Sequence, residues 1–223
     1  MDSTKMYKLL TRWGTNRDVM AALCLIAFYV IWTLRGYLLY ELFGGAAVEV
    51  ESLEQSLFRA ISKFFWLPFA LVMALIYFGK EWRSKIYFSL LRYGKPGSIL
   101  IGFVPFLYAG AFELASNSLP VPVASMLWLI PSVIYEEVLF RGVILPYLVQ
   151  KMAFWKANSI QSVLFLLAHY CWWYFDPSPQ YSITLGASAY IFIVGWLWGY
   201  SAGKSKSISV PLISHFLHNA ILS

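Results

Sequence analysis

The chain has 223 residues, of which 60% are hydrophobic and 13% are charged, and its formal net charge is +6. Ordinary soluble domains carry about 25% charged residues, so this composition excludes a typical soluble protein. It does not indicate a nucleic-acid-binding protein either, because the basic residues lie in short loops between apolar segments and form no dense stripe. We therefore predict an all-α protein, a polytopic transmembrane helical bundle in contact with the lipid bilayer.

Apolar segments near the length that crosses the hydrocarbon layer, about 20 residues, recur from the first to the last part of the chain. We predict about seven spans (six to eight) that form a single integral membrane domain over residues 1–223. The predicted spans are residues 19–40, 61–78, 99–114, 121–147, 160–175, 181–200 and 208–222.

Individual residues refine this prediction. The first segment contains Arg35 and only a loose likeness to a cleavage site, so we interpret it as a retained signal anchor. Pro131 and Pro146 predict a kink or break in the fourth span. Small residues near the end of the sixth span favour close approach of a neighbouring helix. They are Gly195, Gly199, Ser201 and Gly203.

Loop charges predict the orientation. Basic residues occupy every second loop, and the loops between them are acidic or uncharged, which places the N-terminus inside and the C-terminus outside. The basic set is Lys5, Lys8, Arg12, Arg17, Lys80, Arg83, Lys85, Arg92, Lys95, Lys151, Lys156, Lys204 and Lys206; the acidic set is Glu41, Glu49, Glu51, Glu54 and Asp176. We expect a plasma membrane protein of bacterial type.

Three charged residues, Glu136, Glu137 and Arg141, interrupt the apolar fourth span. A charge at the bilayer centre costs roughly 2.5–3.5 kcal/mol on translocon scales, so such residues are rarely retained without a function. Glu137 and Arg141 are spaced i, i+4 with the acid first, which is the favourable order for an ion pair. Glu136 has no partner close in sequence, which makes it a candidate general base.

Two further spans carry polar residues at helical spacing. Phe165 and His169 are i, i+4 in the fifth span, and His215 and Asn219 are i, i+4 in the seventh. The predicted topology places Glu136, His169 and His215 at similar depth, so we expect them to meet. An imidazole and a carboxamide on one face can donate two hydrogen bonds to one point, as an oxyanion hole requires.

In this order, Glu136-Glu137-x-x-x-Arg141, Phe165-x-x-x-His169 and His215-x-x-x-Asn219 resemble the motifs of the CAAX prenyl protease and bacteriocin-processing (CPBP, or Abi) family. These are glutamic intramembrane proteases related to Rce1-type enzymes. The resemblance covers a core of about residues 121–223.

The resemblance implies an endopeptidase that acts on a membrane-associated peptide or protein. Glu136 with His169 would activate the attacking water, and His215 and Asn219 would stabilise the oxyanion. Glu137 and Arg141 would support the site, with Phe165 packing around it. His218 departs from the usual pattern; we interpret it first as a packing residue, and otherwise as a pore-lining residue or a competitor of His215.

The residues leave several alternatives open. A metal site is not expected, since the histidines and glutamates lie on three helices without a His-Glu-x-x-His motif. Cys24 and Cys171 are interpreted as small core residues, and no serine or cysteine nucleophile is indicated. The rival functions are a non-catalytic relative, such as a bacteriocin self-immunity factor or scaffold, and a proton-coupled transporter.

The aromatic residues near the ends of two spans predict interfacial belts. These are Trp172, Trp173 and Tyr174 in the fifth span, and Trp196 and Trp198 in the sixth. The sequence does not indicate the oligomeric state or the particular substrate.

Overall fold

The computed structural model describes residues 3–43, 53–64, 66–88, 94–116, 123–175 and 183–222, and every regular element within these ranges is helical. This confirms the all-α prediction. The elements are α1 (Ser3–Phe43), α2 (Leu53–Phe64), α3 (Trp66–Phe78), the 3₁₀ turn η1 (Gly79–Glu81), α4 (Trp82–Lys85), α5 (Pro96–Ser116), α6 (Val123–Glu136), the π-helix η2 (Glu137–Ile144), α7 (Leu145–Val149), α8 (Phe154–Trp173), α9 (Leu185–Ser205) and α10 (Ser209–Leu222).

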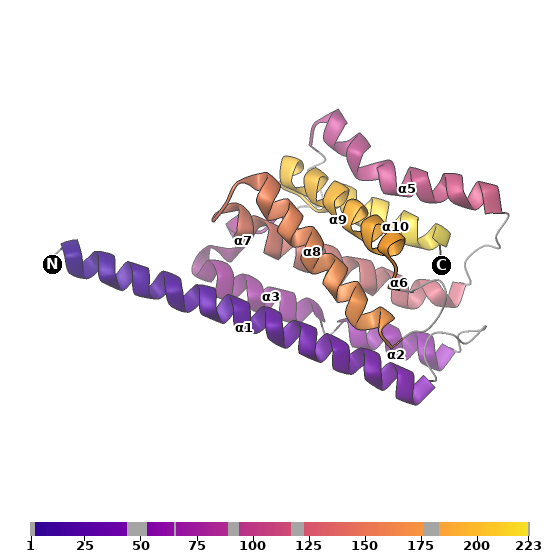
Figure 1. The fold of residues 1–223 in the computed structure, drawn as a ribbon, viewed down its shortest axis with the longest axis horizontal. Coiled ribbons are helices and arrows are strands. Elements are labelled where there is room, and N and C mark those ends of the chain that lie inside the picture. The colour runs from indigo at the N-terminus through magenta and orange to yellow at the C-terminus, as the bar shows by residue number, and fades with distance from the viewer. Residues whose placement is uncertain are drawn as a thin grey trace.

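The helices form one layered bundle. Figure 1 shows α1 along one edge, α5 along the opposite edge, and α8, α9 and α10 between them. In the contacts that hold the bundle together, α8 packs against α1 and α9, while α10 packs against α5 and α6. The helices that carry the three sequence motifs therefore lie in the interior of the bundle.

Three helical stretches in the described part of the chain are long and apolar enough to cross a membrane: Arg17–Leu42, Ala60–Lys85 and Leu185–Ser205. Pro96–Phe112 is a shorter apolar helix. These findings support an integral membrane protein, whereas the number of about seven spans stays a prediction. Residues on which the predicted orientation also depends lie outside the described residues, among them Glu49, Glu51, Arg92 and Asp176.

The surface of α1 shows why a lipid environment suits this fold. Val19, Leu23, Ile26, Val30 and Leu34 follow one another at helical spacing, and each is about half exposed or more. The opposite face of the same helix is buried through Ala21, Phe28 and Trp32. An exposed apolar stripe of this length would be costly in water, and it matches hydrocarbon.

The helix that carries the charged motif widens where the motif begins. α6 continues without a break into η2, where the amide of Leu145 bonds the carbonyl five residues back, at Phe140. Pro146 has no amide hydrogen to give the carbonyl of Gly142, and the amide of Tyr87 donates to that carbonyl at 3.0 Å instead. The span stays helical through Pro131 and Pro146, so the predicted break is absent and the predicted kink stays a prediction. The span instead contains a π-helix, a feature that is frequent at functional sites.

The predicted close approach of α9 to a neighbour is present. A methyl group added at Gly199 would overlap Asn158 Oδ1 and lie 2.7 Å from Gln161 Oε1, and one added at Gly203 would overlap the ring of Phe154. All three partners belong to α8. The small side chains of α9 thus allow α8 and α9 to pack closely.

Candidate active site

Glu137 is the centre of the buried polar cluster. Its Oε1 accepts a hydrogen bond from Arg141 Nη1 at 2.9 Å and lies 2.8 Å from His215 Nδ1. Neither Glu137 nor Arg141 is exposed at all, so the ion pair that the i, i+4 spacing predicts forms in a fully buried setting. A buried pair needs further hydrogen bonds to offset desolvation, and His215 supplies one.

The guanidinium of Arg141, in η2, also contacts residues of α8 and α9. Its Nη2 donates to the carbonyl oxygen of Gly195 in α9 at 3.3 Å. Its Cζ lies 4.0 Å from the ring centroid of Phe165 in α8 and 5.4 Å from that of Trp198 in α9. Arg141 therefore couples the position of Glu137 to the packing of α8 against α9.

Glu136 faces a separate hydrogen-bonded chain. Its Oε1 accepts from Ser132 Oγ at 3.1 Å, and that hydroxyl accepts from Lys63 Nζ at 2.7 Å. The sequence-based view that Glu136 has no local partner is wrong, because Ser132 is one helical turn earlier. Lys63 comes from α2, is 8% exposed and was not predicted; it reaches the site through the packing of α2 against α6.

His215 lies between the two carboxylates. Its Nδ1 faces Glu137, while its Nε2 is 3.8 Å from Glu136 Oε2, which is longer than a hydrogen bond. The imidazole stacks on the indole of Trp198 with ring centroids 4.1 Å apart and an interplanar angle of 26°. His215 is thus held by a carboxylate at one edge and by an aromatic ring on one face.

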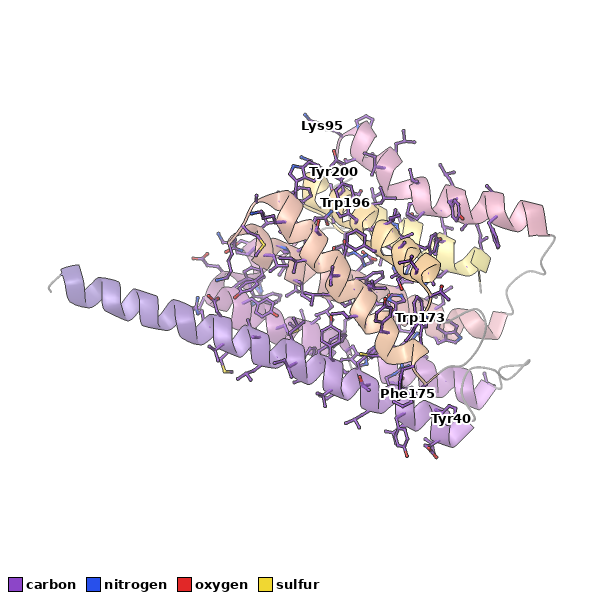
Figure 2. The ribbon with its side chains drawn as sticks, in the orientation of Figure 1. Tyr40, Lys95, Trp173, Phe175, Trp196 and Tyr200 are labelled. Carbon is purple, nitrogen blue, oxygen red and sulfur yellow. The ribbon has the colours of Figure 1, made fainter. Side chains whose placement is uncertain are left out.

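The burial of Trp198 corrects the prediction that this residue belongs to an interfacial belt. Trp198 is 1% exposed, and its Nε1 donates to Ser214 Oγ at 3.1 Å. Trp196 and Tyr200 stack instead with Trp155 near the start of α8. Figure 2 shows them far from Trp173, the last residue of α8, and from Phe175 just beyond it. Trp196 and Trp198 are two residues apart on α9, so the indole of Trp198 faces inward while that of Trp196 faces outward.

His169 has a defined tautomer. Its Nδ1 lies 2.9 Å from the carbonyl oxygen of Phe165, which can only accept, so Nδ1 carries a proton. In the neutral ring Nε2 is then a hydrogen-bond acceptor. Phe165, which is 1% exposed, contacts both histidines, with centroids 4.6 Å from His169 and 6.2 Å from His215.

Trp173 also contacts His169 at 5.7 Å and is 7% exposed, so it belongs to the site's surroundings and not to a belt. The neighbouring Tyr174 is 76% exposed, as an interfacial residue would be, and the side chain of Trp172 lies outside the described part. No direct hydrogen bond joins Glu136 to His169 among the described contacts.

His218 and Asn219 form a second polar group on α10. His218 Nδ1 is 2.8 Å from Asn219 Oδ1, and His218 Nε2 is hydrogen-bonded to the hydroxyl of Tyr190 in α9. His218 is 5% exposed and meets the edge of Trp198 at 5.6 Å. Trp198 therefore contacts both imidazoles of α10.

The next feature is the arrangement of the side chains that can ligate a metal. Within the described ranges, no group of three or more histidine, cysteine, aspartate and glutamate side chains has a geometry that could hold a metal ion. Cys24 and Cys171 are half-buried and carry free thiols. The expectation that the chain uses no metal stays a prediction.

Comparison with known proteins supports the resemblance seen in the motifs. Residues 117–221 match the family model of the type II CAAX prenyl endopeptidases, Rce1-like. This range contains all of the predicted site residues, while the single domain over residues 1–223 and its core of about residues 121–223 stay predictions. The chain has no significant match among curated proteins or among solved structures.

Proposed function

Because residues 117–221 carry an Rce1-like domain of the type II CAAX prenyl endopeptidase family, we propose that this chain is a glutamate-dependent intramembrane endopeptidase. It hydrolyses a peptide bond of a membrane-associated peptide or protein. The observation that carries the proposal is the position of His215, with Nδ1 at 2.8 Å from Glu137 and Nε2 at 3.8 Å from Glu136. This cluster supplies a base and hydrogen-bond donors within one buried site.

The first step uses Glu136 and His169. A water molecule donates one hydrogen bond to the carboxylate of Glu136 and the other to Nε2 of His169, whose Nδ1 is committed to the Phe165 carbonyl at 2.9 Å. Glu136 takes a proton as the water oxygen attacks the carbonyl carbon of the substrate. A base in this position contributes roughly 10²–10⁴ in rate.

The oxyanion that forms needs two donors. His215 donates from Nε2 and Asn219 from its amide Nδ2, one helical turn further along α10. Since Nδ1 of His215 donates to the Glu137 carboxylate at 2.8 Å, Nε2 donates to the oxyanion only when both ring nitrogens carry a proton. Removing one oxyanion donor typically costs ~10²–10³ in rate.

The tetrahedral intermediate then collapses without a covalent enzyme adduct. The carbon–nitrogen bond breaks, the proton held by Glu136 passes to the leaving amine, and the products are a carboxylic acid and an amine. Glu137 and Arg141, whose Oε1 and Nη1 are 2.9 Å apart, hold His215 and touch no substrate in this scheme.

The substrate enters from the bilayer or its surface, because the site lies among helices whose outer faces are apolar. Together with the lipid bilayer, a peptide or protein end at the membrane is the partner we propose. We propose a plasma membrane of bacterial type, and the loop charges favour an orientation with the N-terminus inside.

The test compares the N- and C-terminal peptides of membranes from cells with the intact protein, Glu136→Gln or Glu81→Gln. Glu81 is a matched control, because its side chain is 71% exposed and pairs only with Lys85 among the described ion pairs. We expect termini that appear with the intact protein and with Glu81→Gln and vanish with Glu136→Gln. Identical termini from equally abundant, folded proteins would favour the self-immunity or scaffold alternative.

A second measurement addresses the remaining alternatives. The purified protein, once its substrate is identified, should keep its cleavage rate after treatment with a metal chelator, because the proposed water is activated by Glu136. A chelator-sensitive rate that returns with zinc would contradict this mechanism. Proton flux into proteoliposomes that depends on Glu136 would support the transporter alternative instead.

A further inference from the structure

A chain of two hydrogen bonds connects α9 to the amide of Asn219. The hydroxyl of Tyr190 bonds Nε2 of His218, and Nδ1 of His218 lies 2.8 Å from Oδ1 of Asn219. The phenol and imidazole rings also stack, with centroids 5.9 Å apart and an interplanar angle of 25°. Neither Tyr190 nor His218 has a role in the mechanism proposed above.

The chemistry of these atoms sets the direction of both bonds. Oδ1 of an amide can only accept, so Nδ1 of His218 carries the proton and donates it. In the neutral ring Nε2 then has a lone pair, which accepts from the Tyr190 hydroxyl. Because Oδ1 is turned toward His218, the Nδ2 amino group lies on the other arm of the carboxamide.

From this geometry we propose that Tyr190 and His218 are positioning residues that orient the Asn219 amide so that Nδ2 donates to the oxyanion. The inference rests on the proposed endopeptidase function and deepens it. Both nitrogens of His218 are occupied, so His218 does not compete with His215 for the oxyanion. The edge-on contact of Trp198 with His218, at 5.6 Å and 89°, holds the ring against rotation.

The kinetic test begins with Tyr190→Phe, which keeps the stacked ring and removes the hydroxyl. We expect kcat to fall about 3- to 10-fold with KM little changed, because the amide acts only in the transition state. Tyr170→Phe is the matched control: its hydroxyl also bonds across α8 and α9, to Ser188 Oγ at 2.7 Å, and it has no contact with Asn219 among the described ones. We expect this control to keep the wild-type kcat.

A double-mutant cycle separates positioning from a general effect on folding. In an Asn219→Ala background, which itself lowers kcat, Tyr190→Phe should have no further effect. An equal fall of kcat in both backgrounds, or no fall with Tyr190→Phe alone, would overturn the inference. If Asn219→Ala cleaves at the wild-type rate, the oxyanion assignment in the proposed function fails, and the inference fails with it.

A spectroscopic measurement tests the hydrogen-bonded chain without activity. In ¹⁵N spectra of histidine side chains, the protein in detergent should show His218 protonated at Nδ1 alone, and Tyr190→Phe should convert this signal to a tautomer mixture. His218→Phe identifies the signal by removing it. An unchanged His218 signal in Tyr190→Phe contradicts the positioning role. The expected change in a protein that cleaves nothing would refute the proposed function, and with it the oxyanion role of Asn219, while the hydrogen-bonded chain itself would stand.

Discussion

Arg141 and Glu137 form an ion pair with Nη1 2.9 Å from Oε1, and neither side chain is exposed. The pair lies in the π-helix η2 (Glu137–Ile144), where all eight residues are buried. Charges in such a place interact strongly and are costly to leave unpaired. The pair is therefore a structural requirement for placing His215, whose Nδ1 is 2.8 Å from the same carboxylate oxygen.

Arg141→Met should destabilise the protein more than any surface substitution, by about 3–5 kcal/mol, because Glu137 is left as a buried carboxylate without its cation. Glu137→Met combined with Arg141→Met should recover much of this loss. The double variant should remain inactive, since His215 then has no carboxylate at Nδ1. Thermal unfolding in detergent and the cleavage rate measure the two effects, and recovery of activity in the double variant would contradict the role given to Glu137.

Lys63 should matter for the reaction although it lies outside the matched family range. Its Nζ is 2.7 Å from Ser132 Oγ, which is 3.1 Å from Glu136 Oε1. These two charge-assisted hydrogen bonds hold the carboxylate of Glu136, the proposed base, in place. A hydrogen bond to a charged group contributes about 1.5–3 kcal/mol. Lys63→Met should therefore lower kcat on the order of 10- to 100-fold. The measurement is the cleavage rate over a range of substrate concentrations, from which kcat is obtained.

A matched control for this prediction is Lys85→Met. Lys85 carries the same charge, is 43% exposed and pairs with Glu81 at 3.6 Å at the surface. Its removal should leave kcat unchanged. Ser132→Ala should also lower kcat. The effects of Ser132→Ala and Lys63→Met should not add, because both substitutions break the same row of hydrogen bonds to Glu136. Additive effects would show that Lys63 acts on the site by another route.

Trp198 and Trp196 offer a comparison of two tryptophans on one helix. Trp198→Leu removes the ring that stacks 4.1 Å from His215 and the donor to Ser214, so we expect at least a 10-fold loss of kcat. Trp196→Leu removes a ring that stacks on Trp155 at 5.6 Å, away from the site, and should keep kcat near wild type. Equal losses from both substitutions would show that α9 packing, and not the ring under His215, sets the rate.

Local spacing explains what could be predicted of this site. The Glu137–Arg141 pair depends only on the i, i+4 geometry of one helix, and the length of the apolar segments identifies the helices themselves. The hydrogen bond from Ser132 to Glu136 could have been predicted in the same way, because Ser132 is one helical turn before Glu136. The predicted topology, which places Glu136, His169 and His215 at similar depth, added the expectation that the fourth, fifth and seventh spans share one site.

Contacts between helices explain what could not be predicted. Lys63 lies 69 residues before Ser132, and Tyr190 lies 28 residues before His218, so no local pattern links either pair. Trp198 resembles the nearby Trp196 in sequence, and only the rotation of α9 turns its ring toward His215. Amphipathic periodicity fails here because a helix inside a membrane bundle is apolar on every face.

The last prediction concerns the close packing of α8 and α9. Gly199→Ala should destabilise the protein by about 1–3 kcal/mol, because the added methyl group overlaps Asn158 Oδ1 and lies 2.7 Å from Gln161 Oε1. Gly186→Ala is the matched control on the same helix, since a methyl group there meets no heavy atom within 4 Å. It should keep or slightly raise the unfolding temperature, as alanine favours the helix. The measurement is thermal unfolding of both variants in the same detergent. If Gly199→Ala is as stable as Gly186→Ala, then α9 does not depend on small residues to approach α8. The distances that place Arg141 against both helices must then have another cause.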